Sequence, residues 1–327
     1  MPRLPRLATA LAVTAAFTVL AAGTAVSAGD PTVSDPRVVA HFDFAAGQTP
    51  ENIALEPDGS ADLTFAYAHQ VARVDKDGTT EVLATLPDVA NPQTPNIGAA
   101  VTTGIARAHD GTLYVAYATG TAAENGIWRI PPGGTPELMA HLPADGLPNG
   151  IALDEECGTI YVADSVRGVV WRVPVGEDAH TVWASGAALE PTVEIPFGAN
   201  GLKLHNGAVW VSNTGQGTLL RIPIGPGPDH AAGPVETRAT GLTMDDFAFT
   251  GHGDTVLAAL VLEDKLELVR PDGSHKTVLT QADGLRNPTS VAVHAKKVYV
   301  PSAAYFAPPN TTPDPNLLLA RISKNKD

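Results

Sequence analysis

The amino-acid sequence predicts an all-β fold, a six-bladed β-propeller whose ring is closed by an N-terminal strand. The first observation behind this prediction is an apolar tetrapeptide that recurs six times, as NIAL (52–55), GIAR (104–107), GIAL (150–153), GLKL (201–204), DFAF (246–249) and SVAV (290–293). The first aliphatic or aromatic positions of successive copies are 44 to 52 residues apart. A period of about 40–50 residues built from short strands is typical of propeller blades.

The second observation is that each repeat reads as a series of short strands. After the apolar tetrapeptide comes a run such as LYVAYA, IYVADS or VWVSNT, and then a run such as IWRIP, VWRVP or LLRIP. These runs are rich in β-branched and aromatic residues, and Gly, Asp, Asn and Pro turns separate them. We therefore expect negligible helix in this part of the chain.

The third observation concerns the closure of the ring. The last repeat lacks a fourth strand, but RVVAHFDFAAGQTPENIAL (37–55) parallels ELMAHLPADGLPNGIAL (137–153) almost position by position. The segment from Arg37 to Phe44 should therefore form the outer strand of the last blade. This pairing would cover sheet edges that otherwise invite aggregation.

Residues 1–28 have the layout of a secretory signal peptide. Arg3 and Arg6 form a basic start, an Ala-rich apolar stretch follows at 7–26, and Val-Ser-Ala ending at Ala28 offers a cleavage point. An uncleaved membrane anchor is the alternative, but the stretch is rich in Ala, Thr and Gly rather than Leu and Ile. We expect cleavage near Ala28 and a secreted protein that leaves the membrane.

Residues 29–327 should form a single propeller domain that is strongly acidic. Without the two arginines of the leader, 19 Lys and Arg face 35 Asp and Glu. Such a surface repels nucleic acid and anionic lipid and favours cation binding. The only cysteine, Cys157, excludes an intrachain disulfide. It lies in the turn EECG with no flanking His or Asn, so we interpret it as a turn residue rather than a nucleophile.

A ring of polar residues precedes the six apolar tetrapeptides at a fixed offset, two places before the first apolar position. Its members are Glu51, Thr103, Asn149, Asn200, Asp245 and Thr289. Pseudo-sixfold symmetry places equivalent offsets at one height in the channel, so the two carboxylates and two amides should reach a common axial point. Hard oxygen donors of this kind suit Ca²⁺ best, with Mg²⁺ or Zn²⁺ as alternatives. Ordinary turn residues are the competing interpretation, which the shared offset disfavours.

Further residues could complete this site. Asp164 in VADS and Asn213 in VSNT lie at matched positions after the second strand, where they could line the channel or simply cap a strand. Three Pro-rich segments, 91–101, 187–199 and 305–316, are long enough to form the rim of a pocket.

The motifs PENIAL, LPNGIALD with IYVADS, and ANGLKL together resemble the SMP-30/gluconolactonase family of six-bladed propellers. The resemblance spans the whole of residues 29–327. It implies a lactonase dependent on Ca²⁺ or Zn²⁺, with Glu51, Asn149 or Asn200, and Asp245 as ligands and Asp245 also as general base. The chain departs from the family pattern at PNIGAAVTTG and at Met244-Asp245-Asp246, which favours either an altered substrate or a non-catalytic binding protein.

Two functions follow from these observations. The first is a secreted metal-dependent hydrolase of a small-molecule lactone or related ester, in which Asp245 or its neighbour Asp246 accepts a proton from water. The second is a non-catalytic propeller that binds a small ligand or a partner protein. A lyase would require a His base near the metal, and no His occupies the ring offset.

Overall fold

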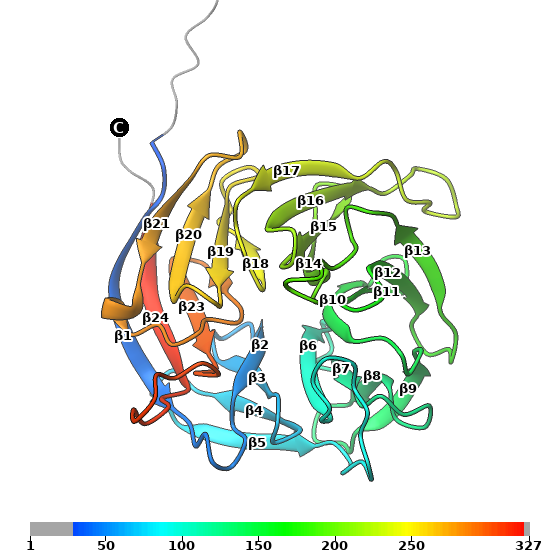
Figure 1. The fold of residues 1–327 in the computed structure, drawn as a ribbon, viewed down its shortest axis with the longest axis horizontal. Helices are drawn as coiled ribbons and strands as arrows, with labels where there is room; N and C mark the ends of the chain where they lie inside the picture. The colour runs from blue at the N-terminus through cyan, green and yellow to red at the C-terminus, as the bar shows by residue number, and fades with distance from the viewer. Residues whose placement is uncertain (1–28, 324–327) are drawn as a thin grey trace, which may run out of the picture.

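Six antiparallel sheets of four strands each are arranged around a central channel (Figure 1). The structure, a computed structural model, describes residues 29–323, so the expected signal peptide lies outside the described residues. Within that range the only helical element is a 3₁₀ turn at Gln281–Asp283. No helix among the described residues has the length and apolar character needed to cross a membrane. The predicted six-bladed propeller is confirmed.

The chain passes through the blades in order, and in each blade the strand nearest the channel comes first. The strands of blades one to three are β2 (Pro50–Leu55), β3 (Ala61–Phe65), β4 (Gln70–Val74), β5 (Thr80–Thr85), β6 (Val101–Arg107), β7 (Leu113–Ala118), β8 (Gly126–Ile130), β9 (Glu137–His141), β10 (Pro148–Asp154), β11 (Thr159–Asp164), β12 (Val169–Pro174) and β13 (Thr181–Ser185). Those of blades four to six are β14 (Ala199–His205), β15 (Ala208–Asn213), β16 (Thr218–Pro223), β17 (Glu236–Thr240), β18 (Phe247–Phe249), β19 (Val256–Leu260), β20 (Lys265–Val269), β21 (His275–Leu279), β22 (Ala292–His294), β23 (Lys297–Ser302) and β24 (Asn316–Ser323), with β1 (Thr32–His41) as the twelfth.

The core of the protein lies between blades rather than within them. The second strand of blades one to five is buried along its whole length, as in LYVAYA of β7 and TIYVAD of β11, and in blade six only the first residue of β23 is partly exposed. In the outermost strands of blades one to five, such as β5, only one residue of each strand is buried. Six clusters of buried apolar side chains each join two neighbouring blades. A strand buried on both faces needs apolar residues at successive positions, which explains the composition of the repeats.

The ring closes where the sequence predicted, through an N-terminal strand in the last blade. In Figure 1, β1 (blue) lies beside β24 (red), and the two strands are antiparallel with Val38 opposite Leu318. The bounds differ from the predicted segment, because β1 begins at Thr32 and ends at His41 rather than running from Arg37 to Phe44. Residues 44–47 instead form a turn, and Phe44 is 38% exposed.

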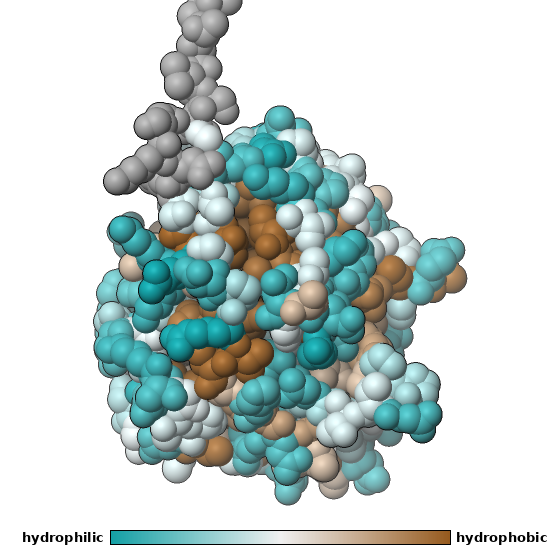
Figure 2. Space-filling view, turned by 90° about the vertical axis from the view of Figure 1, so that its left-hand side faces the viewer, coloured by the Kyte–Doolittle hydropathy of each residue, from teal (hydrophilic) through white to brown (hydrophobic). Residues whose placement is uncertain are grey.

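Asp30 extends this closure beyond the last blade. Its carboxylate lies 2.7 Å from Arg270 Nη2 and 2.9 Å from Lys276 Nζ, both of blade five. The surface on this side of the ring is largely hydrophilic, with apolar residues showing only in patches between charged and polar ones (Figure 2). The start of the described chain therefore contacts two blades, blade six through β1 and blade five through Asp30.

Candidate functional site

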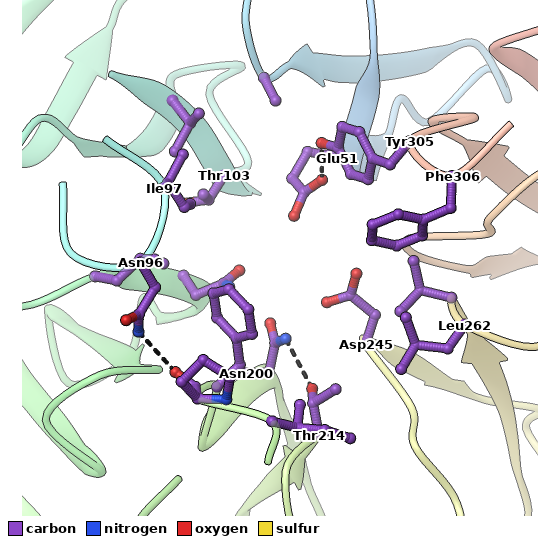
Figure 3. Close-up of a pocket in the computed structure, with 18 of the residues that line it drawn as sticks. Glu51, Asn96, Ile97, Thr103, Asn200, Thr214, Asp245, Leu262, Tyr305 and Phe306 are labelled. Carbon is purple, nitrogen blue, oxygen red and sulfur yellow. Dashed lines mark hydrogen bonds between the residues drawn. The ribbon is translucent and has the colours of Figure 1, made fainter. Parts of the chain in front are cut away.

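A pocket of about 620 Å³ lies at one mouth of the central channel (Figure 3). Its walls include residues from all three Pro-rich segments that the sequence predicted to form a rim. These residues are Asn96, Ile97 and Val101 from the first segment, Glu194, Ile195, Pro196 and Phe197 from the second, and Tyr305 and Phe306 from the third. The long loops therefore gather on one face of the ring, above the inner strands.

Five of the six predicted ring residues line this pocket. They are Glu51, Thr103, Asn149, Asn200 and Asp245. Each stands within two residues of the start of an innermost strand, so the blade symmetry brings them to one height around the axis. Figure 3 shows the side chains of Glu51, Asn200 and Asp245 directed toward the same open space.

The two asparagines present their side-chain oxygens to the pocket because their amide nitrogens are engaged elsewhere. Asn200 Nδ2 donates to Thr214 Oγ1 at 2.9 Å, and Thr214 Oγ1 donates to the backbone oxygen of Met244 at 2.8 Å. A hydroxyl that has given its proton to a carbonyl can only accept from the amide, which fixes the amide orientation. Asn149 repeats this arrangement through Ser165, at 3.2 Å.

A second set of hydrogen bonds holds the backbone just before the ring residues. The hydroxyl of Ser165 donates to the oxygen of Ala199 at 2.8 Å, as Thr214 does to Met244. In blades two and six the ring threonine itself takes this role. The oxygen before Asn149, on Pro148, accepts from Thr103 at 2.8 Å, and the oxygen before Glu51, on Pro50, accepts from Thr289 at 2.9 Å.

Thr289 is thus a strut between blades six and one and does not line the pocket, contrary to its predicted place beside the site. It is fully buried. Thr103 lines the pocket but has donated its proton to Pro148. The two threonines therefore position the polar ring, and the carboxylates and amides supply its unengaged oxygens.

Glu51 and Asp245 are two acids in an environment that disfavours charge. Burial raises the pKa of Glu51 to about 7, although a hydrogen bond of 2.5 Å from Tyr305 Oη to Glu51 Oε2 opposes the shift. Burial, together with the negative charge of Glu51, raises the pKa of Asp245 well above its usual range. Burial and the charge of Glu51 also raise the pKa of the Tyr305 hydroxyl, so it remains a hydrogen-bond donor.

Asp246, the other predicted catalytic acid, does not line the pocket. Its carboxylate forms an ion pair with Lys203, with both oxygens 2.7 Å from Nζ, and accepts hydrogen bonds from Ser290 at 2.6 Å and Asn52 at 3.2 Å. Successive residues of an extended chain project to opposite sides, so Asp245 and Asp246 cannot both face the same space. Of the two aspartates, only Asp245 faces the pocket.

Asp164 and Asn213 cap strand ends and do not line the pocket. Asp164 Oδ1 accepts from the backbone nitrogens of Leu147 and Arg167, and Oδ2 accepts from Trp171 Nε1. Asn213 Nδ2 donates to the backbone oxygens of Ala188 and Glu190, which fixes the second Pro-rich segment. In the structure both side chains cap strand ends, one of the two roles that the sequence left open.

The residues that sequence reasoning missed stand one position further along. Ser165 follows Asp164, and Thr214 follows Asn213, and these hydroxyls contact the ring asparagines. The two-residue period of a strand is the signal that could have identified them. Tyr67 and Leu262 were missed because nothing in the repeat pattern marks loop residues, and Tyr305 was predicted only as part of the rim segment 305–316.

No Lys, Arg or His side chain is among the residues that line the pocket. Within residues 29–323 no group of three or more His, Cys, Asp and Glu side chains is placed to hold a metal, so any cation site here depends on the asparagine oxygens. Elsewhere, His230 Nε2 lies 3.6 Å from Cys157 Sγ, a neighbour that the sequence did not predict. Partial desolvation and nearby Asp154 raise the pKa of this thiol, which disfavours a nucleophilic role.

No protein-family model and no curated protein matches this sequence. Solved structures match over almost the whole chain at low identity. A calcium-binding protein, regucalcin, from Agrobacterium tumefaciens has a TM-score of 0.64 and 16% identity, covering 89% of this chain and 95% of its own. The PQQ-bound form of an aldose sugar dehydrogenase from Streptomyces coelicolor has a TM-score of 0.63 and 19% identity, covering 90% and 99%.

A gluconolactonase from Xanthomonas campestris has a TM-score of 0.61 and 15% identity, covering 90% of this chain and 98% of its own. These three proteins share the architecture of this chain but carry names of different activities. At such identities the likeness establishes the propeller fold alone.

Proposed function

We propose that this protein is a secreted hydrolase that depends on a divalent cation and acts on a lactone or related ester in the channel-mouth pocket. One observation carries the proposal. Two carboxylates, Glu51 and Asp245, face one space that no basic side chain lines, and the amide oxygens of Asn149 and Asn200 are oriented toward the same space. Buried acids without a positive partner are costly unless a cation joins them.

The donor set fits a hard cation. Glu51, Asn149, Asn200 and Asp245 offer oxygen ligands only, which Ca²⁺ prefers and which also suit Mg²⁺, with Zn²⁺ less well matched. Ca²⁺ takes about 6–8 oxygens, so four side chains leave positions for water and substrate. A cation between Glu51 and Asp245 would also offset the repulsion that raises the pKa of Asp245.

Each side chain then has a distinct role in ester hydrolysis. When bound, the cation supplies Lewis acidity to the ester carbonyl. Asp245 accepts the proton of the attacking water and returns it to the leaving alkoxide, which opens the lactone ring. Tyr305 holds Glu51 in one orientation through its hydrogen bond. The apolar walls exclude bulk water and so strengthen these polar interactions.

The resemblance to the SMP-30/gluconolactonase family supports this assignment and is part of the proposal. Its motifs PENIAL and ANGLKL contain Glu51 and Asn200, two residues of the polar ring. The structural likeness to a gluconolactonase and to a calcium-binding regucalcin is consistent with it.

The test combines cation binding with turnover. Calorimetric titration of EDTA-treated protein with Ca²⁺ should show one site, and the loaded protein should hydrolyse members of a lactone panel. Asp245→Asn should lower the hydrolysis rate at least about a hundredfold, the range expected for loss of a general base. Asp88→Asn, which removes a fully exposed carboxylate, is the matched control and should change neither quantity.

Retention of the full rate by Asp245→Asn would contradict the assigned role. Absence of both cation binding and turnover with Ca²⁺, Mg²⁺ or Zn²⁺ would instead favour the non-catalytic binding protein.

A further inference from the structure

The apolar side chains of the channel-mouth pocket indicate which class of substrate it binds, a property that the polar ring does not determine. Of the seven large apolar or aromatic side chains that are exposed in the described residues, four line this pocket: Phe44, Tyr67, Leu262 and Phe306. Phe306 is 62% exposed and Leu262 is 49% exposed. Exposed apolar side chains that gather in one place mark a site that binds apolar surface.

Tyr305 joins two of these side chains, Tyr67 and Phe306, into an aromatic wall of the pocket. The rings of Tyr67 and Tyr305 meet edge to face with centroids 6.0 Å apart, and those of Tyr305 and Phe306 lie 6.2 Å apart. In Figure 3, Phe306 and Leu262 lie on the same side of the pocket as Asp245. The wall therefore lies next to the carboxylates, so a substrate whose reacting group reaches Asp245 would place its remaining atoms against it.

The charge of the pocket is the second observation. Three carboxylates, Glu51, Glu194 and Asp245, line it without any basic side chain. The hydroxyls of Thr103, Thr214 and Tyr305 have each donated their protons within the protein. With a divalent cation bound, three ionised carboxylates still leave the pocket net negative, so an anionic substrate group would meet net repulsion and few available donors, which disfavours its binding.

We infer that the pocket selects uncharged substrates with an apolar body, such as an alkyl- or aryl-substituted lactone or ester, and rejects anionic and polyhydroxylated ones. This inference rests on the proposed function for the reacting group, but its basis is the wall rather than the ring. Hydroxyl groups placed against Phe306 and Leu262 would lose water without gaining partners, which costs binding free energy. A cavity of about 620 Å³ accommodates a ligand of this size.

A series of lactams tests the inference without turnover, because a lactam resists hydrolysis under these conditions. Calorimetric binding to EDTA-treated and to Ca²⁺-loaded protein is measured for pyrrolidone, N-octylpyrrolidone and N-(carboxyheptyl)pyrrolidone. The octyl compound should bind at least about tenfold more tightly than pyrrolidone, since each buried methylene contributes about 0.8 kcal/mol. The carboxylate of the third compound should remove most of that gain.

Matched variants locate the effect. Phe306→Ser and Leu262→Ser should each weaken binding of N-octylpyrrolidone about tenfold, whereas Val182→Ser, at an exposed valine of β13 outside the pocket, should not change it. Thermal unfolding of each variant verifies that the fold is retained. Equal affinities for pyrrolidone and its octyl derivative, or equal affinities for the neutral and anionic compounds, would overturn the inference.

The outcome separates the inference from the proposed function. If the lactams behave as expected but no lactone is hydrolysed, the apolar selectivity stands and the hydrolase does not. If gluconolactone is hydrolysed faster than an alkyl-substituted lactone, the hydrolase stands and the selectivity fails.

Discussion

The hydroxyl of Tyr305 donates a hydrogen bond to Glu51 across 254 positions of sequence, at an oxygen–oxygen distance of 2.5 Å. Glu51 belongs to the first blade, whereas Tyr305 lies in the long loop that joins β23 to β24 in the sixth blade. Blades six and one are neighbours in the closed ring, so the two residues meet at the pocket. The contact links the apolar wall to the polar floor, since Phe306 adjoins Tyr305.

Removing this hydrogen bond should weaken cation binding. In Tyr305→Phe the ring and its packing remain, but Glu51 loses the donor that orients its carboxylate. We expect the affinity for Ca²⁺ to fall about three- to tenfold, as for the loss of one charge-assisted hydrogen bond. Calorimetric titration measures it, and Tyr67→Phe, whose hydroxyl does not contact Glu51, is the control. Equal losses in both variants would contradict the positioning role of Tyr305.

Removing the charge of Glu51 should stabilise the cation-free protein. Glu51→Gln abolishes the repulsion that Asp245 experiences and avoids a buried charge, so the melting temperature in EDTA should rise by a few degrees, about 1–2 kcal/mol. The same variant should lose the stabilisation that Ca²⁺ gives to the wild type. Thermal unfolding with EDTA and with Ca²⁺ measures both effects. A lower melting temperature in EDTA would argue against repulsion between the two carboxylates.

The hydroxyl that orients Asn200 should matter for both stability and binding. Thr214→Val leaves the amide of Asn200 and the oxygen of Met244 without partners, so stability should fall about 1–2 kcal/mol and Ca²⁺ affinity about tenfold. Thr218→Val is a matched control, because the buried Thr218 hydroxyl has no hydrogen-bond partner. Urea unfolding measures the stability of each variant, and calorimetric titration measures its affinity for Ca²⁺. The orientation argument fails if Thr214→Val binds Ca²⁺ as tightly as the control.

Acid should destabilise the hairpin turns. Asp58, Asp77, Asp110 and Asp272 each accept the backbone N–H of the residue two positions later, and these hydrogen bonds lower their pKa values. A carboxyl whose pKa is lower in the folded than in the unfolded protein stabilises the fold when the pH is above the pKa of the unfolded state. This stabilisation is lost as the pH falls through the pKa of the folded state. The free energy of unfolding should therefore decrease below about pH 4.

The triple variant Asp58→Asn, Asp110→Asn, Asp272→Asn tests whether these carboxyls cause the loss of stability in acid. It should show a shallower decrease in stability between about pH 4 and pH 2, because three of the titrating groups are gone. Urea unfolding at several pH values provides the comparison. An acid limb as steep as that of the wild type would show that other carboxyls cause it.

Ring closure should depend on β1. Removing residues 29–41 uncovers the edge of β24, so we expect aggregation and a markedly lower melting temperature. Asp30→Asn removes only the surface ion pairs with Arg270 and Lys276 and should cost less than about 1 kcal/mol. Light scattering and thermal unfolding measure the two. A truncated protein that remained monomeric and as stable as the wild type would contradict the role of β1.

Sequence periodicity was sufficient for the architecture because each blade repeats the same local rules. The apolar tetrapeptides fixed the number of blades, and the likeness of residues 37–55 to 137–153 identified the closing strand. Symmetry also brought Glu51, Asn149, Asn200 and Asp245 to one pocket, since equal offsets in equivalent strands occupy equal heights.

The direction of individual side chains could not be obtained in this way. Asp246 and Asp164 are adjacent to residues of the site, yet their carboxylates serve Lys203 and the turn after β11. Neighbouring residues of an extended chain project to opposite sides of the strand. A position predicted to within one residue therefore does not determine which side chain faces the pocket.

The sequence by itself thus determined the six blades, the closing strand and the height of the polar ring, because these follow from a local pattern repeated along the chain. Only the tertiary structure decided that Tyr305 holds Glu51, that Ser165 and Thr214 orient the asparagines, and that Phe306 and Leu262 wall the pocket. Tyr305, Phe306 and Leu262 lie in loops that share no pattern in sequence, and the directions of the Ser165 and Thr214 hydroxyls depend on how neighbouring strands pair within a blade.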